Sequence, residues 1–421
     1  MPLLKTYTLG CKVNQYETEY LRQGLLAAGY RDAAEGERAD LCIVNTCTVT
    51  LEGDYKSRKL IRALARDNPG AGIVVMGCYA TRAPGEVAAL PGVVEVLEDK
   101  RRLPEWLAAH GVAEPPRGIA AFPRLHRALV KVQDGCTLAC SYCIIPSVRP
   151  RLWSRPIDET VDEVRRLAAG GHREIVLTGI HLGLYGAGHG PGQRLSDLLA
   201  RLLEIDGDFR IRLSSLEAGE ATPELLALMA ARQDRICPHL HLPLQSGSDR
   251  VLQAMRRPGT AAQIIEKCRR ICEQLDRPSL TTDAIVGFPG ETEADFEDTC
   301  RVVEAAGFSK IHVFRYSARD GTPAAALADA VPPKVKHRRA AALAELSRVL
   351  AQRYCQSLVG RELQVLVEGR HPQRPGWFLG TADRYVPVEV EGPESLLDRL
   401  VAVRILGRDG EKLLGRAKTS S

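Results

Sequence analysis

Long hydrophobic runs are missing from this sequence, and that absence narrows what the protein can be. No apolar run approaches the ~20 residues that a helix needs to span a bilayer, so we expect no membrane-spanning segment. The opening MPLLKTYTLG lacks the charged, apolar and small-residue layout of a signal peptide. Low-complexity tracts are also absent, and the charged fraction of 26% is ordinary for a globular protein. These absences together predict a cytoplasmic protein of two or three folded domains.

Cysteine, by contrast, is plentiful, with 12 residues in a chain of 421. Cytosolic thiols stay reduced, so this number argues against a disulfide framework and for metal ligation together with some buried thiols. Three of the cysteines, Cys136, Cys140 and Cys143, share the short segment DGCTLACSYC. The spacing CxxxCxxC lets one loop donate three thiolates to three irons of a 4Fe–4S cluster, leaving the fourth iron open to an outside ligand.

No fourth cysteine or histidine lies close to this loop. A structural zinc ion normally takes four protein ligands, so the missing fourth ligand favours an iron–sulfur cluster over zinc. A zinc site and three unrelated core thiols remain the alternatives. An iron with a free coordination site, in a protein as large as this one, favours a catalytic cluster over a purely structural one.

Three further cysteines stand at corresponding places in a repeated pattern. The first ~110 residues alternate apolar strands with amphipathic helices, which indicates a parallel sheet covered on both faces. Cys11, Cys47 and Cys78 each lie at or just beyond the end of a predicted strand, about one βαβ unit of ~30 residues apart. Since the carboxyl ends of parallel strands share one edge, we expect these thiols to converge, as a second cluster would require. The alternative is that the three cysteines are buried separately and bind no cluster. We expect Cys42, which lies inside the apolar run LCIVN, to be a core residue.

The rest of the chain divides into a linker and two further parts. A segment rich in proline, glycine and alanine, at 110–125, reads as a linker. Six alternating strand and helix segments then favour a partial TIM-like (βα)6 barrel with its chemistry at the carboxyl ends of the strands. Short strands with Gly and Pro turns follow, typical of a small antiparallel β-barrel that holds RNA. The expected domains are 1–112, 126–353 and 355–421.

Basic residues and the remaining cysteines allow weaker inferences. The net charge is only +5, but the stretch 334–354 contains a single acid, Glu345, and an acid-free piece carries Arg149, Arg151 and Arg155. Such clusters could follow a phosphate backbone, although a solvated helix face is equally consistent. Cys268 and Cys272 share a helical stripe with isoleucines, which predicts a buried helix face for both.

The motifs together resemble the methylthiotransferases of the radical S-adenosylmethionine superfamily over essentially the whole chain. Besides the cysteine loop, the matching segments are LTGIHLGLYG, HLPLQSGSDRVLQAMRR, TDAIVGFPGETEADFEDT and FRYSARDGTPAA. The opening TLGCKVNQYETE resembles the branch that acts on N6-threonylcarbamoyladenosine in tRNA. The branch that acts on isopentenyladenosine typically has Gln-Met-Asn after the first cysteine. The branch that acts on a ribosomal protein typically has Pro-Lys-Asn there, whereas this chain has Lys-Val-Asn.

The resemblance implies particular cofactors and ligands. It implies two 4Fe–4S clusters: a radical cluster held by Cys136, Cys140 and Cys143, and an auxiliary cluster held by Cys11, Cys47 and Cys78. It implies that S-adenosylmethionine lies across the barrel mouth, with candidate contacts at Gly179, Glu217, Gln245, Val286, Gly287, Phe314 and Tyr316. Two alternatives remain for these contacts, since GFPGE also suits a strand-to-helix turn and Glu217 could pair with a surface arginine.

The resemblance also implies an activity and partners. The enzyme would insert a methylthio group at C2 of N6-threonylcarbamoyladenosine immediately 3′ of the anticodon, with a TRAM-type C-terminal barrel and the basic helix holding the tRNA. An electron donor such as flavodoxin or ferredoxin would supply the radical cluster, and nothing demands more than a monomer. Alternative targets are isopentenyladenosine in tRNA and a ribosomal protein. An alternative of another class is a non-catalytic RNA-binding protein with structural or redox-sensing clusters.

Overall fold

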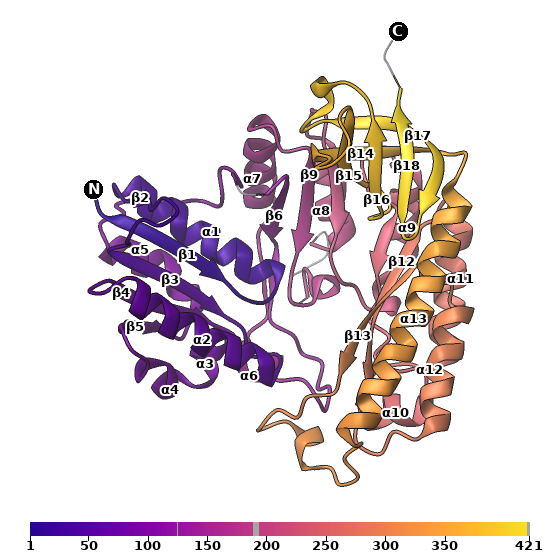
Figure 1. The fold of residues 1–421 in the computed structure, drawn as a ribbon, viewed down its shortest axis with the longest axis horizontal. Helices are drawn as coiled ribbons and strands as arrows, with labels where there is room; N and C mark the ends of the chain where they lie inside the picture. Colours follow the sequence, from indigo (N-terminus) through magenta and orange to yellow (C-terminus); the bar gives the residue numbers. More distant parts are fainter. Residues whose placement is uncertain (124, 188–192, 419–421) are drawn as a thin grey trace.

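The computed structural model describes residues 1–123, 125–187 and 193–418. Three parts follow one another along the chain: a parallel-sheet α/β part, a larger half-barrel of strands and helices, and a small β-barrel (Figure 1). This is the multidomain α/β architecture that the sequence predicted. Within the described residues, no helix combines the length and apolarity needed to cross a membrane.

The N-terminal sheet is parallel throughout, in the order β2-β1-β3-β4-β5. Its strands are β1 (Leu3–Thr8), β2 (Arg31–Asp32), β3 (Leu41–Thr46), β4 (Gly72–Gly77) and β5 (Val93–Leu97). Its helices are α1 (Lys12–Ala27), α2 (Leu51–Asp67), α3 (Cys78–Arg82), α4 (Pro84–Ala88), the 3-10 turn η1 (Lys100–Arg102) and α5 (Leu103–Ala109). Successive residues of β3 enter different cores, Cys42 and Val44 under α2 and Ile43 under α1 and α5. The sheet is therefore buried on both faces, which explains its near-continuous apolar strands.

The half-barrel contains two three-stranded parallel sheets, β10-β9-β6 and β11-β12-β13. Bridges such as Ser215 to His241 join them, and a single hydrophobic core runs beneath both. The strands are β6 (Arg127–Lys131), β9 (Glu174–Thr178), β10 (Arg210–Leu213), β11 (His239–His241), β12 (Ser279–Val286) and β13 (Lys310–Arg315), with the short pair β7 (Gln133–Asp134) and β8 (Trp153–Ser154).

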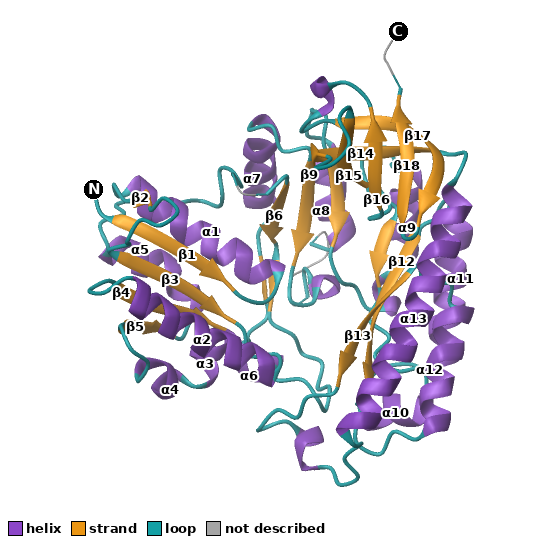
Figure 2. Cartoon of the chain, viewed as in Figure 1, coloured by secondary structure: helices purple, strands orange, loops and turns teal. Residues whose placement is uncertain are grey.

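Helices cover the outer side of these strands, and α11, α12 and α13 lie along β12 and β13 in Figure 2. The helices are α6 (Ile145–Val148), α7 (Ile157–Ala169), α8 (Leu195–Leu203), α9 (Pro223–Ala231), α10 (Asp249–Ala254), α11 (Ala261–Gln274), α12 (Glu293–Ala305) and α13 (Pro333–Leu358), with 3-10 turns η2 (Leu182–Leu184), η3 (Ala218–Glu220) and η4 (Pro323–Ala326). The buried stripe of α11 is narrower than expected: Cys268 is buried, but Cys272 is exposed. The prediction of a buried Cys272 was wrong.

The C-terminal part is a closed barrel in the order β14-β15-β16-β18-β17. Its elements are β14 (Glu362–Arg370), β15 (Trp377–Ala382), β16 (Pro387–Glu391), the turn η5 (Glu394–Leu396), β17 (Leu400–Asp409) and β18 (Lys412–Ala417). All pairs are antiparallel except β16 with β18, which is parallel, so the predicted antiparallel barrel needs this one amendment. The parallel pair arises because the chain crosses to β17 before β18 returns beside β16.

A buried ionic cluster attaches the C-terminal barrel to the half-barrel. Glu174, at the start of β9, pairs with Arg210 and Arg212 of β10 at 2.6 Å each. Both guanidinium groups also donate to backbone carbonyls of the C-terminal barrel. Arg210 donates to Gln364 and Thr381, and Arg212 donates to Ala382 and Asp383. These residues stand at the amino ends of the strands, so the C-terminal barrel docks at the end opposite the Cys136 loop (Figure 1).

Replacing Glu174 with glutamine should destabilise this junction. Burial alone would raise the pKa of Glu174, but Arg212 and Arg210 hold it well below its ordinary value. Removing one member of a buried ion pair costs about 3–5 kcal/mol, because the arginines lose their counter-charge. Because folding lowers the pKa of Glu174, the stability that its ion pairs contribute is present in full above the ordinary glutamate pKa. That stability is lost as the pH falls towards the lowered pKa. Urea unfolding at neutral pH measures the loss.

The matched control is Glu394→Gln, which removes an exposed carboxylate paired with Arg370. Such exposed pairs contribute about 0–1 kcal/mol. Equal unfolding free energies for Glu174→Gln and the control would contradict the role of Glu174 at the junction.

Candidate active site

Two groups of cysteines meet where the N-terminal sheet faces the half-barrel. The carboxyl ends of β1, β3 and β4 point toward the carboxyl ends of the half-barrel strands (Figure 1). Cys78 packs directly against Ile144 and Val148, which follow the CxxxCxxC loop. The two cysteine groups are therefore held against each other across the boundary between the two parts.

The first group comes from three strand ends of the N-terminal sheet. Cys11 precedes the first residue of α1, Cys47 follows β3, and Cys78 begins α3. Gly10 has φ +100°, and a Cβ there would lie 3.2 Å from the sulfur of Cys47, so glycine permits the close approach of these two loops. Burial raises the pKa of Cys47 to about 11, with Cys78 and Cys11 adding to the shift. The structure thus brings the three thiols together, while their role as ligands stays a prediction.

The second group lies on the loop after β7. The Ser141 amide donates to the Met255 carbonyl at 2.9 Å, and the Ala324 amide donates to the Ser141 carbonyl at 2.8 Å. These backbone bonds fix the segment between Cys140 and Cys143. Burial raises the pKa of Cys143 to about 12, and the neighbouring Cys140 and Cys136 add to it. Because iron binds thiolates rather than thiols, cluster insertion here must displace protons.

Two polar side chains contact this loop. His181 Nδ1 lies 3.5 Å from the Cys136 sulfur, and its Nε2 lies 2.6 Å from Glu220. Burial alone would lower the pKa of His181, but hydrogen bonds to Cys136 and Glu220 raise it to about 9. Arg257, buried on the other side, donates from Nη1 to the Cys140 sulfur at 3.7 Å. A positive charge therefore stands beside each of these two sulfurs at neutral pH.

The donor set suits two anionic iron–sulfur clusters. Buried guanidinium atoms without a partner in the described part of the chain are Nε of Arg149, Arg173 and Arg257, and Nε and Nη1 of Arg319; all but Arg173 lie near a predicted cluster ligand. Arg149 interacts electrostatically with Cys11, Arg257 contacts Cys140, and Arg319 donates to Thr48, beside Cys47. No three ligand-type side chains among the described residues are placed to hold a single metal ion. A cubane does not require that, since each of its irons takes one thiolate.

Three of the predicted S-adenosylmethionine contacts lie beyond strands β9 to β11. Gly179 follows β9, and a Cβ there would come within 2.8 Å of the Gln133 side chain, so this glycine makes room for Gln133. Glu217 pairs with Arg257 at 2.6 Å; its partner is a buried arginine rather than a surface one. Gln245 is buried and adopts φ +69°. Contact of any of the three with the cofactor stays a prediction.

The other four predicted contacts gather where β12 and β13 end. Val286 is fully buried at the end of β12, and its carbonyl accepts the Tyr316 amide at 2.9 Å. Gly287 follows with φ +75°. Phe314 is 47% exposed, whereas Tyr316 packs edge-on against Phe288 at 5.5 Å. The structure brings these four residues together, and Phe314 is the one whose side chain is open to a ligand.

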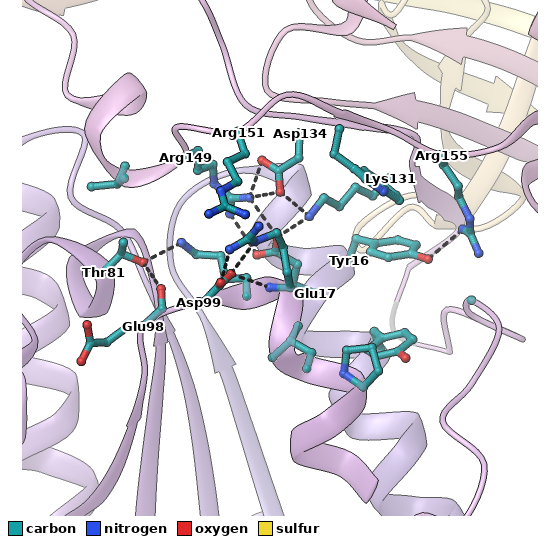
Figure 3. A pocket seen from close by; sticks show the side chains of 18 of the residues that line it. Tyr16, Glu17, Thr81, Glu98, Asp99, Lys131, Asp134, Arg149, Arg151 and Arg155 are labelled. Atoms are coloured by element: carbon teal, nitrogen blue, oxygen red, sulfur yellow. Dashed lines mark hydrogen bonds and ion pairs between the residues drawn. The ribbon is translucent and has the colours of Figure 1, made fainter. Parts of the chain in front are cut away.

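A buried ionic network holds the N-terminal part against the half-barrel (Figure 3). Arg149 donates to Glu17 at 2.9 Å and to Asp134 at 2.8 Å, and Lys131 donates to Glu17 at 2.7 Å. Burial alone would raise the pKa of Glu17, but Arg149 and Lys131 lower it to about 2. Arg149 also donates to Asn14, three residues after Cys11. The network therefore fixes the separation of the two cysteine groups.

Several of these neighbours escaped sequence reasoning. Arg149 and Arg155 were grouped with Arg151 as candidates for phosphate contact or a solvated face, yet the first two are buried and only Arg151 is exposed. His181 and Arg257 lie in the segments LTGIHLGLYG and HLPLQSGSDRVLQAMRR. An imidazole or guanidinium group inside these motif segments was the available signal of a functional residue. Spacing along the chain does not tell which sulfur such a group contacts.

Two family models match the chain. Residues 130–303 match the Radical SAM superfamily, and residues 4–98 match a family described as Uncharacterized protein family UPF0004. Among solved structures, the radical S-adenosylmethionine methyltransferase TsrM from Kitasatospora setae aligns with a TM-score of 0.57 at 17% identity, covering 77% of each chain. At that identity the likeness shows the fold alone.

Curated relatives resemble the chain over nearly its full length. The chain is 38% identical to the threonylcarbamoyladenosine tRNA methylthiotransferase MtaB of Bacillus subtilis, covering 96% of this chain and 94% of that protein. The protein of the same name from Thermotoga maritima is also 38% identical, over 97% and 96%. The tRNA-2-methylthio-N(6)-dimethylallyladenosine synthase of Thermobifida fusca is 36% identical, over 86% and 78%.

Proposed function

The chain belongs to the methylthiotransferase family of radical S-adenosylmethionine enzymes, and we propose that it inserts a methylthio group at C2 of N6-threonylcarbamoyladenosine in tRNA. The observation that carries this proposal is that Cys78, of one triad, packs against Ile144 and Val148, which directly follow the loop of the other triad. Hydrogen abstraction and sulfur donation must both reach one carbon atom, so their sources have to face a common space. Relatives that carry the same printed name support the choice of adenosine derivative.

Each triad has its own chemistry in this proposal. Cys136, Cys140 and Cys143 hold the 4Fe–4S cluster that, when bound, supplies the electron for cleavage of S-adenosylmethionine to methionine and a 5′-deoxyadenosyl radical. Cys11, Cys47 and Cys78 would hold a second 4Fe–4S cluster, whose open iron would carry the sulfur to be inserted. A second S-adenosylmethionine would supply the methyl group. The adenine C2–H bond is not acidic enough for a side-chain base, which is why a cofactor has to carry this step.

The protein's own residues position these groups. Arg257 and His181 place positive charge beside the sulfurs of Cys140 and Cys136, where an anionic cluster would lie. Glu217 in turn holds Arg257 in place. The network around Arg149 keeps the N-terminal triad at a fixed distance from the half-barrel. Rigid placement of this kind is what aligns reacting atoms.

The remaining parts of the proposal concern partners and organisation. The C-terminal barrel and α13 bind tRNA, and an electron donor such as flavodoxin or ferredoxin reduces the radical cluster. The domains are 1–112, 126–353 and 355–421, with α13 running through the last boundary. The protein works as a cytoplasmic monomer. Salt-sensitive tRNA affinity is the expected signature of phosphate contacts.

Mass spectrometry of tRNA nucleosides tests the function directly. The gene is expressed in a bacterial host that lacks its own methylthiotransferases. We expect a new mass matching 2-methylthio-threonylcarbamoyladenosine. A new 2-methylthio-isopentenyladenosine would instead identify the other tRNA branch. No new nucleoside, with both clusters loaded, would contradict a tRNA substrate.

Lys12 should contribute to the choice of this substrate. It follows Cys11 directly, its side chain is exposed, and it forms no ion pair with any described residue. The threonylcarbamoyl group ends in a carboxylate, which isopentenyl lacks, so an exposed cation on the residue after Cys11 favours the former. Hydrogen bonds to charged groups contribute about 1.5–3 kcal/mol, so Lys12→Gln should lower kcat/KM by roughly 10–100-fold. Kinetics on an anticodon stem-loop carrying N6-threonylcarbamoyladenosine measures this.

Lys12→Arg is the matched control, because it keeps the positive charge at the same place. It should retain most of the activity. An unchanged kcat/KM in Lys12→Gln would exclude a part for Lys12 in substrate choice.

A further inference from the structure

A pocket of about 650 Å³ opens between the N-terminal part and the half-barrel, beside the ionic network around Arg149 (Figure 3). We call it the interface pocket. Its walls come from α1, the start of α5, the segment 116–118, the segment 147–155 and the strands β6 and β7. Its volume lies within the range of about 300–1,000 Å³ that is typical of small-molecule and nucleotide sites.

Some of the charged side chains that line the interface pocket form ion pairs, and others form none. On its inner wall Lys131, Arg149, Glu17 and Asp134 neutralise one another. Three other lining cations, Lys100, Arg117 and Arg151, form no ion pair within the described part of the chain, although Lys100 donates to the Thr81 hydroxyl. Arg117 and Arg151 are exposed. One lining carboxylate, Glu98, also forms no ion pair among the described residues, so the unpaired charge of the pocket is positive on balance, which suits an anionic ligand.

An aromatic ring stands beside these cations. Trp153 is 40% exposed, and its strand β8 pairs with β7 at Asp134, so the backbone that carries the ring is anchored. Lys131 Nζ lies 5.7 Å from the ring centroid. A large apolar ring on an anchored strand, left open to solvent between arginines, is the arrangement on which single-stranded nucleic acid bases stack.

The interface pocket adjoins both cysteine groups. Thr81 lines it from α3, the helix that begins at Cys78, and Ser147 lines it from α6, which begins two residues after Cys143. The C-terminal barrel, in contrast, docks at the opposite ends of the half-barrel strands. Contacts near the reacting base therefore have to come from other elements than that barrel.

We propose that the interface pocket binds one nucleotide of the tRNA anticodon loop next to the target, with its base on Trp153 and its phosphates on Arg117, Arg151 and Lys100. This inference rests on the proposed tRNA substrate. Adding a second anchor to the loop would hold the target base splayed toward the cysteines. An acidic electron-donor protein would also seek positive charge, but it needs neither a concave pocket nor a stacking ring.

The test measures binding of an anticodon stem-loop to the full-length protein with both clusters loaded. Removing two phosphate contacts in the double variant Arg117→Gln, Arg151→Gln should weaken binding by about tenfold at low salt and flatten the slope of log K against log salt by about 1.4, since each contact to a single strand contributes about 0.7. Arg62→Gln is the matched control, since it removes an exposed arginine on α2, outside the pocket. It should change neither quantity.

Tryptophan fluorescence provides a readout that a merely structural role would not move. Stem-loop binding should quench part of the emission of the wild-type protein. Trp153→Phe keeps a stacking ring, so it should bind nearly as tightly but lose that part of the quenching. Trp153→Ala should bind about tenfold more weakly.

The outcomes separate this inference from the proposed function. If the wild-type protein methylthiolates tRNA but the pocket variants bind the stem-loop as Arg62→Gln does, the interface pocket is not an RNA site and the function stands. If the variants only slow reduction by a flavodoxin while RNA binding is unchanged, the pocket docks the reductant and the inference is overturned. Absence of any methylthio product from the wild-type protein would overturn the function itself.

Discussion

Replacing Cys47 with alanine is expected to abolish methylthio insertion while leaving cleavage of S-adenosylmethionine in place. Cys47 follows β3 in the N-terminal part, where it lies close to Gly10 and Gly53 and its carbonyl accepts from Ser57. The auxiliary cluster would lose one of its three thiolates, whereas Cys136, Cys140 and Cys143 remain. The measurement is parallel quantification of 5′-deoxyadenosine and of the methylthio nucleoside after anaerobic reconstitution. The iron content should fall by roughly half, since one of two equal clusters is lost.

Cys42→Ala is the control for this experiment. Cys42 lies near the start of β3, the strand that Cys47 follows, and is buried under α2. Its replacement removes a small apolar group and should cost about 1–2 kcal/mol of stability without affecting either product. Normal methylthiolation by Cys47→Ala would mean that the proposed role of the N-terminal part is wrong.

Replacing Cys140 with alanine is expected to remove both products. Cys140 is buried in the loop whose backbone is fixed by Met255 and Ala324. With two thiolates left, the radical cluster should not assemble, and without it S-adenosylmethionine is not cleaved. The measurement is again 5′-deoxyadenosine, now with dithionite as the reductant so that a docking defect with a protein donor is excluded.

The control for this second experiment is Cys268→Ala, which removes a fully buried thiol of α11 in the same half-barrel. It should keep cofactor cleavage at the wild-type rate. If Cys140→Ala produced 5′-deoxyadenosine at that rate as well, the loop would not be the site of reductive cleavage. Comparing Cys140→Ala with Cys47→Ala then separates the two clusters, because only the former is expected to stop cleavage.

The sequence by itself determined the architecture and the two cysteine groups. Alternating apolar strands and amphipathic helices specify a parallel sheet with helices on both faces, because each apolar face has to be buried. Cys136, Cys140 and Cys143 lie within eight residues, so any fold keeps them close. Cys11, Cys47 and Cys78 stand at strand ends, and parallel strands place such ends on one edge. These inferences need only local periodicity and chain direction.

Only the tertiary structure decided which distant side chains meet. Arg149 and Arg155 carry the same sequence signal as Arg151, yet their environments differ. Arg149 is buried in an ion pair with Glu17 of the N-terminal part, Arg155 is buried against Glu163 of α7, and Arg151 is exposed at the interface pocket. Likewise Glu217 finds Arg257, 40 residues away, beside Cys140. The C-terminal barrel docks away from the cysteines because Glu174 and its arginines stand at the amino ends of their strands. Spacing along the chain fixes contacts within a loop or a sheet edge, whereas contacts between packed parts depend on how their surfaces fit.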